Sequence, residues 1–133
     1  MIFLDTSGLF ALLDSDDRFY EPACEIWGRW NTQKVPLLTS NYVLLETSAL
    51  VQRRLGLRSL QVLHTYVLLP VEIHWISKTT HQDAVTNLIT ANRRQLSLVD
   101  CSSFTLMRAL GLQQVFTFDQ HFAEQGFTCL PQP

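Results

Sequence analysis

The sequence predicts an α/β fold, in which a mostly parallel sheet is flanked by helices in a three-layer α/β/α arrangement. Short apolar runs alternate with segments of helical periodicity, and consecutive βαβ crossovers place strands inside and helices outside. Two of the apolar runs, at residues 1–4 and 115–118, end in an aspartate, as expected at the carboxyl end of a buried strand. The 133 residues contain no repeat or flexible linker, so we expect one domain over 1–133.

The N-terminal half is predicted to contain strands at 1–4 and 35–38 and helices at 6–13, 20–30 and 40–56. Thr6 or Ser7 can cap the first helix, and Thr39 or Ser40 the third, because short polar side chains accept hydrogen bonds from free N–H groups of a first turn. The second helix repeats apolar residues at helical spacing and tolerates Pro22 in its first turn.

The C-terminal half is predicted to contain helices at 57–69, 80–94 and 101–110 and strands at 71–76, 115–118 and 128–130. The segment from Thr80 to Asp83 resembles a capping box that would open the second of these helices. Asp100 precedes the third, so its carboxylate would lie at the positive end of that helix, and Gly111 would close it.

Four carboxylates are the candidate catalytic and metal-binding residues: Asp5, Glu46, Asp100 and Asp119. The first and last follow predicted strands, and open α/β sheets bind ligands at the carboxyl ends of their strands. The other two would reach the same crevice from helices. Carboxylate oxygens suit Mg²⁺ or Mn²⁺, whereas the lack of His and Cys at ligand spacing argues against zinc. The four acids therefore predict a divalent-metal site.

Each acid also has a purely structural explanation. Asp100 could cap its helix, and Asp5 or Asp119 could belong to a turn after a strand. Glu46 is harder to explain in this way, because the positions three and four residues away are apolar or aromatic: Tyr42, Val43, Ala49 and Leu50. An unpaired buried carboxylate is costly, so a metal, an arginine or exposure at the edge of the apolar stripe should compensate it.

The ordered motifs of the chain are Asp5-Thr6-Ser7, Glu46, Ser97-Leu98-Val99-Asp100 and Thr117-Phe118-Asp119-Gln120-His121-Phe122. Over essentially the whole chain they resemble those of PIN-domain nucleases, in particular the small bacterial and archaeal VapC-like toxins. The resemblance implies that the four acids bind Mg²⁺ or Mn²⁺ and cleave RNA, with Thr6 and Thr117 as supporting hydroxyls. It also implies a small antitoxin partner and a homodimer.

Two positions depart from that pattern. Tyr20 stands where many of these nucleases carry His in the early helix, and Cys101 replaces the common small residue after the third acid. Neither change removes a metal ligand, so the expected activity is unaffected.

Arginines near the acids are candidate contacts to an RNA backbone: Arg53, Arg54, Arg93 and Arg94. Such contacts would position a substrate without reading its sequence, but each arginine is about as well explained by a solvated helix face. The formal net charge of -2 provides no global attraction to RNA, so local arginines or bound cations would have to supply it. His121 could steady a phosphate, although a solvated loop histidine is the more common case.

Trp27, Trp30 and the region of Phe10 and Leu13 could form an apolar groove for a helix of an antitoxin, although core packing is the commoner role of such residues. A helix that carried an Arg or Lys into the acid pocket would inhibit catalysis by replacing the charge of the metal.

The predicted reaction is metal-assisted hydrolysis of RNA phosphodiester bonds. One alternative is a non-catalytic PIN-like scaffold that binds other proteins. Another is an acid-cluster phosphatase or a receiver-type phosphoryl-transfer domain, but the phosphatase pattern requires a second Asp two residues after the first, and position 7 is Ser.

Cys24, Cys101 and Cys129 are odd in number and far apart, which fits neither a disulfide framework nor a zinc knuckle. No uncharged run approaches the roughly 18 residues that a membrane span needs. The composition therefore predicts a soluble protein of the reducing cytoplasm.

Overall fold

A computed structural model describes residues 1–133, and its centre is a five-stranded sheet in the order β3-β2-β1-β4-β5. The strands are β1 (Ile2–Leu4), β2 (Leu37–Ser40), β3 (Val71–His74), β4 (Gln114–Phe116) and β5 (Thr128–Leu130). Every neighbouring pair is parallel, and Ile2 of β1 stands opposite Leu37 of β2 on one side and Gln114 of β4 on the other. The predicted α/β/α class is confirmed.

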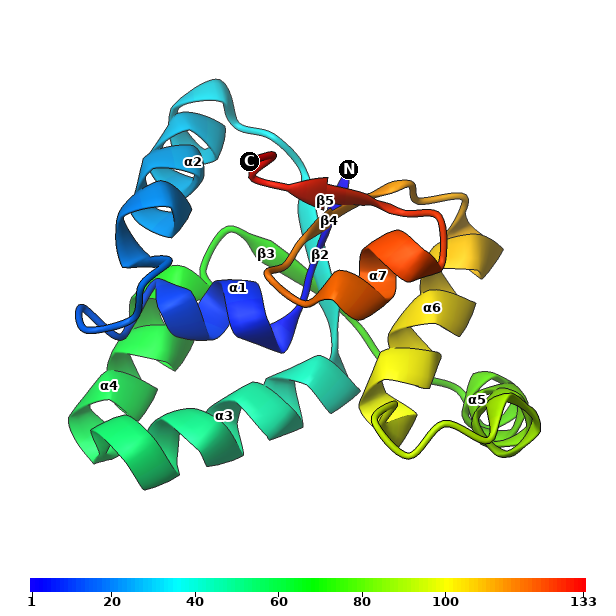
Figure 1. Cartoon of the computed structure of the whole chain (residues 1–133). Coiled ribbons are helices and arrows are strands. Elements are labelled where there is room, and N and C mark those ends of the chain that lie inside the picture. The colour runs from blue at the N-terminus through cyan, green and yellow to red at the C-terminus, as the bar shows by residue number, and fades with distance from the viewer.

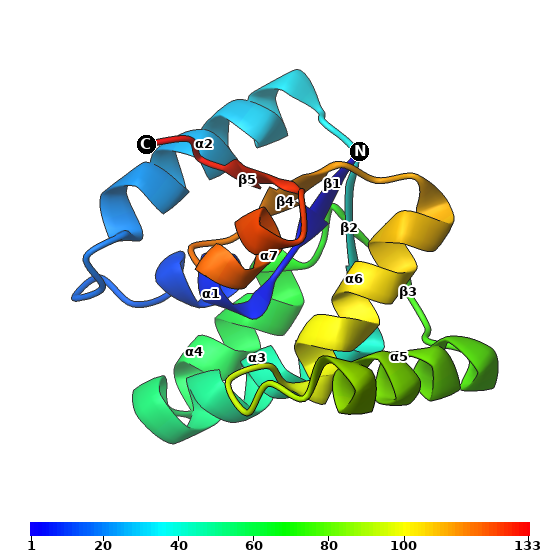
Figure 2. The ribbon, with the colours of Figure 1, turned by 45° about the vertical axis from the view of Figure 1, so that its right-hand side comes forward.

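The helical segments are α1 (Thr6–Ala11), α2 (Tyr20–Gln33), α3 (Asn41–Leu55), α4 (Leu57–Val62), the π-helical turn η1 (Leu63–Val67), α5 (Lys78–Ala91), α6 (Leu98–Leu110) and α7 (Gln120–Glu124). Helices α1 to α4 lie on one side of the sheet, and α5 and α6 pack against each other on the opposite side (Figures 1 and 2). This division follows from the strand order, because a right-handed crossover changes face when the chain reverses its direction across the sheet. None of the helices has the length and apolar character needed to cross a membrane.

The core forms where β1 and β4 lie side by side in the middle of the sheet. A cluster of 20 buried residues includes Phe3, Leu4 and Phe116 of these strands, all without solvent exposure. Trp30 of α2 stands edge-on to Phe116, with ring centroids 5.3 Å apart. Trp30 and Phe10 are only 6% and 5% exposed, so these two residues belong to the core and do not line an open groove.

The N-caps of α1, α5 and α6 differ from the predictions, whereas that of α3 agrees. Asp5, rather than Thr6 or Ser7, is the N-cap of α1, because its backbone is extended and its carboxylate accepts from the Ser7 N–H. Helix α5 begins at Lys78 with Ser77 as its cap, so the capping box predicted from Thr80 is wrong. Ser40 caps α3, as expected, by accepting a 3.1 Å hydrogen bond from the Val43 N–H.

Helix α6 begins at Leu98, three residues before the predicted start. Ser97 is its N-cap, and Asp100 is the third residue of the helix, so the two form a reciprocal capping box with hydrogen bonds of 3.0 and 3.1 Å. The expectation that Asp100 itself caps the helix is wrong, but its carboxylate still lies in the first turn. Gly111 closes α6 in the left-handed conformation, as predicted.

Other boundaries shift by a few residues. The helix predicted over 57–69 is divided into α4 and η1, and β2 lies two residues later than expected. Strand β4 ends at Phe116, so Thr117 lies just beyond it. The short helix α7 was not predicted, because five residues are too few to produce a readable helical period.

Candidate active site

The four predicted acids come from the region where β1 and β4 end. Asp5 directly follows β1 and caps α1, while Asp119 lies three residues beyond β4 and caps α7. Glu46 projects from the second turn of α3, and Asp100 from the first turn of α6. Thr117 Oγ1 bonds both Oδ2 of Asp5 and the Asp119 N–H, so the ends of β1 and β4 bring these two acids together. The charges of Asp100 and Asp119 are close enough to raise the pKa of other members of the set: Asp100 acts on Asp5 and Glu46, and Asp119 acts on Glu46 and Asp100.

Asp5 is the most deeply placed of the four, with 4% of its surface exposed. Burial raises its pKa from 3.8 to about 6, and repulsion from Asp100 adds to this effect. Hydrogen bonds from the hydroxyls of Thr117, at 2.8 Å, and Ser7, at 2.9 Å, act in the opposite direction by stabilising the carboxylate. Asp5 is thus a buried acid whose Oδ2 atom accepts both hydroxyl hydrogen bonds.

Glu46 lies at the edge of the buried face of α3, which is formed by Val43, Thr47 and Val51. Ala49 is exposed, so the four apolar neighbours do not enclose the carboxylate as expected. Desolvation is still the largest cause of its raised pKa, followed among the raising effects by the charges of Asp100 and Asp119, while the Thr6 hydroxyl lowers it. No arginine pairs with Glu46.

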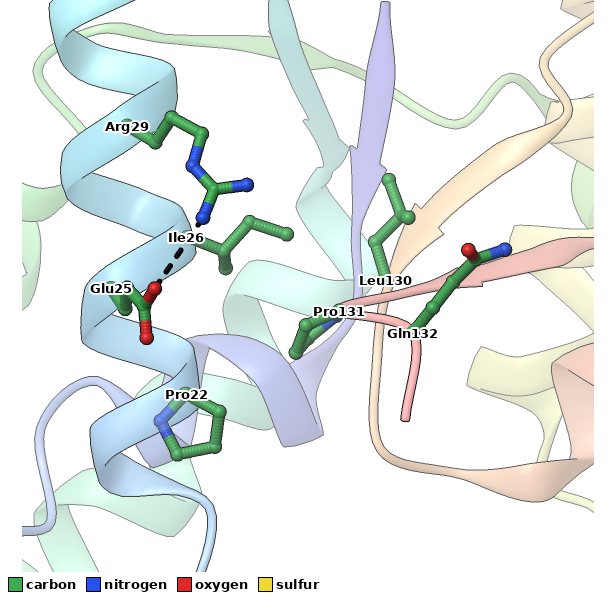
Figure 3. Close-up of a pocket in the computed structure, with 7 residues that line it drawn as sticks. All are labelled: Pro22, Glu25, Ile26, Arg29, Leu130, Pro131 and Gln132. Carbon is green, nitrogen blue, oxygen red and sulfur yellow. Dashed lines mark hydrogen bonds and ion pairs between the residues drawn. The ribbon is translucent and has the colours of Figure 1, made fainter.

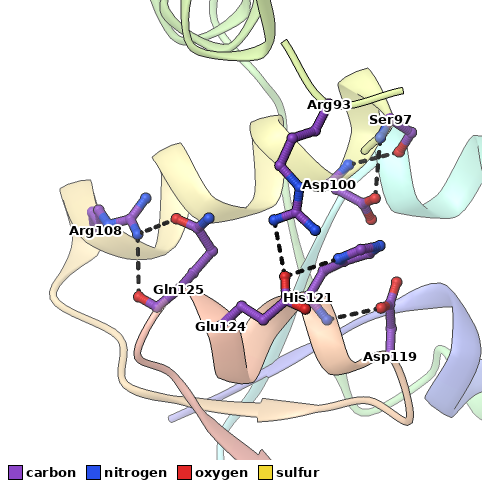
Figure 4. Close-up of polar contacts among 8 residues, drawn as sticks. All are labelled: Arg93, Ser97, Asp100, Arg108, Asp119, His121, Glu124 and Gln125. Carbon is purple, nitrogen blue, oxygen red and sulfur yellow. Dashed lines mark hydrogen bonds and ion pairs between the residues drawn. The ribbon is translucent and has the colours of Figure 1, made fainter. Parts of the chain in front are cut away.

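Asp100 and Asp119 face the same region from α6 and α7. The pKa of Asp100 is raised first by desolvation and then by the charge of Asp119, whereas its bond from the Ser97 N–H and the nearby His121 lower it. Asp119 accepts a 2.9 Å hydrogen bond from the His121 N–H through Oδ1. In Figure 4 the His121 ring lies beside Asp100.

The donor set suits a hard cation such as Mg²⁺ or Mn²⁺. The hydrogen bonds of the chain engage a single oxygen of each aspartate, namely Oδ2 of Asp5 and Asp100 and Oδ1 of Asp119. No three of the His, Cys, Asp and Glu side chains stand in an arrangement that would hold an ion without moving. A cation would therefore require side-chain rotation, and its charge would relieve the repulsion that raises these pKa values.

A hydroxyl network ties the ends of β1 and β4 together. Ser7 Oγ and Thr117 Oγ1 lie 3.0 Å apart, and both donate to Oδ2 of Asp5. The same two oxygens accept from the backbone N–H groups of Phe118 and Asp119, at 2.9 and 3.0 Å. The network thus orients Asp5 and fixes the segment that carries Asp119.

Close approach of α1 to β4 makes this network possible. A Cβ atom on Gly8 would lie 2.7 Å from the carbonyl oxygen of Phe116, so no other residue fits there without movement. Thr6, the other predicted supporting hydroxyl, accepts a 3.0 Å bond from Thr47, whereas the side-chain hydrogen bonds of Asp5 come from Ser7 and Thr117. Ser7 was expected only as a helix cap, although a hydroxyl two residues after a strand-end aspartate is the signal that could have identified it.

Glu124 links a predicted arginine to the histidine beside the acids. Its Oε2 lies 3.0 Å from Nη1 of Arg93 and 3.2 Å from Nδ1 of His121, and these two hydrogen bonds lower its pKa (Figure 4). The His121 side chain is only 14% exposed and belongs to α7, so the expectation of a solvated loop histidine is wrong. Glu124 was not identified from the sequence, because α7 was not predicted.

The predicted arginines occupy two separate places. Arg93 and Arg94 lie in the exposed connection between α5 and α6, and Arg93 is tied to Glu124. Arg53 and Arg54 lie in the last turn of α3, about two helical turns of roughly 5.4 Å each beyond Glu46. The guanidinium of Arg54 stands over the ring of Phe10 at 5.8 Å. Of the four, only Arg93 is linked through a side chain to the acid region.

The sequence of the chain matches one family model and one characterised protein over nearly its whole length. The family model of the PIN domain matches residues 2–127. The 23S rRNA-specific endonuclease VapC20 of Mycobacterium tuberculosis, in two strains, is 34% identical over 129 residues, which cover 96% of this chain and 95% of VapC20.

Two solved structures are similar to the fold. The crystal structure of Mycobacterium tuberculosis VapC20, described as a sarcin-ricin loop cleaving toxin, superposes with a TM-score of 0.86 and 30% identity over 96% of this chain and 97% of the other. FitAcB from Neisseria gonorrhoeae superposes with a TM-score of 0.68 and 16% identity over 97% and 96% of the two chains, a likeness of fold alone.

Proposed function

The chain belongs to the PIN-domain family, as the resemblance of its motifs predicted, and on that premise we propose that it is a metal-dependent endoribonuclease and the toxin of a toxin–antitoxin pair. The single observation that carries the proposal is the convergence of four carboxylates beside the ends of β1 and β4, in a chain 34% identical to an rRNA endonuclease. We propose further that residues 1–133 act as one nuclease domain built around one sheet.

Asp5, Glu46, Asp100 and Asp119 are the proposed ligands of Mg²⁺ or Mn²⁺. When bound, such a cation lowers the pKa of a coordinated water and neutralises charge on a phosphodiester. The residues of the chain have a distinct task, which is to hold four mutually repelling carboxylates in place. Thr117 and Ser7 orient Asp5, Ser97 holds Asp100, and the His121 N–H holds Asp119. Thr6 supports Glu46.

The RNA backbone is the proposed ligand of Arg93 and Arg94, with Arg53 and Arg54 extending the contact along α3. Arg93 is 44% exposed, which leaves guanidinium donors free for a phosphate while Glu124 orients the group. Such contacts position RNA without reading its bases, so they set affinity and its dependence on salt.

Apolar side chains on the surface support the proposed protein partners. Leu45 of α3 and Trp75 after β3 are both 73% exposed, and they border one hollow together with Asn41, Leu44, Ser48 and His64. Exposed apolar patches of this kind are sites of association, and a second copy of the chain is the proposed occupant. An antitoxin would bind elsewhere and block the acids. The three free cysteines suit the reducing cytoplasm in which RNA is translated.

The decisive test is cleavage of RNA that includes the sarcin-ricin loop of 23S rRNA, with Mn²⁺, with Mg²⁺ and with a chelator. We expect cutting that needs the cation and is lost in Asp5→Asn and Glu46→Gln. The matched control is Asp83→Asn, which changes an exposed acid of α5 and should leave cleavage unchanged. Cleavage by purified Asp5→Asn, or cleavage in the presence of chelator, would contradict the assignment. Cation binding without cleavage of any RNA would favour the scaffold alternative.

A further inference from the structure

An apolar cavity opens directly beside the acids. Its volume is about 480 Å³, and Thr117 and Asp119 form part of its wall. This size falls in the range of roughly 300–1,000 Å³ that is typical of pockets for small organic groups. Because Thr117 also donates to Asp5, the cavity and the acid cluster share a wall.

The lining selects a flat, neutral group. Its wall is formed largely by rings and other carbon surface, from Phe19, Pro22, Phe118, Pro131 and Pro133. The wall contains a carboxylate, Asp119, but no Lys, Arg or His, so a phosphate would be repelled there. Gln120 and Gln132 add two amide side chains to the lining, and an amide can donate to and accept from the edge of a planar heterocycle.

A stacked pair of rings forms the aromatic wall. The rings of Phe19 and Phe118 are parallel within 6° and their centroids lie 4.3 Å apart, while the guanidinium of Arg18 stands 4.4 Å from the Phe19 centroid. The Phe118 N–H donates to Ser7, which itself donates to Asp5. A group that packs in this cavity would therefore contact a segment that also orients the buried acid.

A second hollow continues from the first. Figure 3 shows Pro22 of α2 facing Pro131, and these two residues together with Gln132 border both cavities. The second hollow contains Arg29, which forms an exposed 3.4 Å pair with Glu25. Arg29 is 59% exposed despite this pair, so beyond the apolar cavity it offers a guanidinium to the next phosphate of a strand whose base occupies the cavity.

We propose that the cavity bordered by the stacked pair of Phe19 and Phe118 and by Pro131 is a nucleobase subsite, which receives one unstacked base next to the phosphodiester that is cut. This inference rests on the proposed ribonuclease function. Recognition of single-stranded RNA commonly uses bases that are splayed out and packed against aromatic side chains. The two glutamines at its rim would contribute the preference for one base over another.

The test uses short RNA substrates in which each nucleotide around the cut is replaced in turn by an abasic residue. We expect one position at which the abasic substrate loses roughly 5- to 150-fold in kcat/KM, the effect of removing one stacked base. Ala123→Leu fills the cavity from the exposed face of α7. It should slow cleavage of intact RNA to the rate of the abasic substrate and abolish the difference between the two. Ala109→Leu, an exposed alanine of α6, is the control and should behave as the wild type.

A binding measurement separates this inference from the proposed function. In the Asp5→Asn background, we expect intact RNA to bind more tightly than abasic RNA, and Ala123→Leu to remove the difference, whether or not the wild type cleaves. Equal binding and cleavage of intact and abasic RNA at every position would overturn the subsite. The subsite would also be overturned if the Ala123→Leu protein distinguished intact from abasic RNA as well as the wild type does. The same holds if this variant had lost only the binding of an antitoxin.

Discussion

The hydroxyl of Thr117 donates a 2.8 Å hydrogen bond to Oδ2 of Asp5 across 112 positions of sequence. This bond joins the residue after β4 to the residue after β1, and it is one of the two hydroxyl contacts that keep the pKa of Asp5 from rising further. The acid cluster therefore depends on the pairing of two central strands as well as on its acids.

Thr117→Val should weaken catalysis without removing a metal ligand. The isosteric side chain cannot donate, so the pKa of Asp5 should rise and the Asp119 N–H should lose its acceptor. A buried hydrogen bond to a charged group contributes about 1.5–3 kcal/mol, so we expect a loss of at least about tenfold in kcat and weaker Mn²⁺ binding by calorimetry. Thr117→Ser should restore both. Wild-type rates in Thr117→Val would exclude a supporting role for this hydroxyl.

Asp5 should make the metal-free protein less stable as the pH rises. Its folded pKa of about 6 exceeds the usual 3.8, so between these values the folded state binds more protons than the unfolded state, and the free energy of unfolding falls with increasing pH. The loss is complete above about pH 6 and amounts to at most about 3 kcal/mol.

Urea denaturation from pH 4 to 8 measures this effect. Asp5→Asn should remove most of the decline and should be more stable than the wild type at pH 7 without metal. Saturating Mn²⁺ should restore the stability of the wild type but not change that of the variant. A wild-type stability that increases steadily over this range would contradict the burial of an ionisable Asp5.

Gly8→Ala should disrupt the junction of α1 and β4. The added methyl group would meet the carbonyl oxygen and the ring of Phe116 at 2.7 to 2.8 Å, and overpacking of this kind costs about 1–3 kcal/mol. Gly28→Ala on α2 is the matched control, because nothing lies within 4 Å of its added Cβ. That change should stabilise the helix by roughly 0.5–1 kcal/mol. Thermal unfolding measures the stability of both variants. Equal stabilities would show that the fold does not depend on the close approach of Gly8 to Phe116.

Arg93→Gln and Arg94→Gln should weaken RNA binding more than Arg53→Gln and Arg54→Gln. Arg93 pairs with Glu124 of α7 and Arg94 follows it in the chain, whereas Arg53 and Arg54 lie in the last turn of α3. Removal of one phosphate-binding arginine should reduce the slope of log K against log salt by about 0.7 for a single strand. Fluorescence anisotropy at several salt concentrations, in the Asp5→Asn background to prevent cleavage, measures the slopes. If substitutions in the two pairs weakened RNA binding equally, the RNA backbone would have to run along α3 as well.

Local patterns were sufficient for most of the fold and for the identity of the acids. Helix ends were less predictable, because Ser77 and Ser97 compete with nearby residues of equal capping propensity and only the path of the chain decides between them. Glu46 was interpreted as surrounded by an apolar face, but the packing of α3 leaves Ala49 in solvent and Glu46 at the edge. Spacing along a helix does not reveal how wide its buried face will be.

The sequence by itself determined the alternation of strands and helices, the parallel sheet, and the position of Asp5 and Asp119 after buried strands, because these follow from the hydrophobic pattern of each segment. Only the tertiary structure decided which side chains hold Asp5, how Glu124 joins Arg93 to His121, and that Phe19 and Phe118 line a cavity at the acids. Several of these contacts join residues that are about 30 to more than 100 positions apart. They depend on strand order and register, which no local pattern encodes.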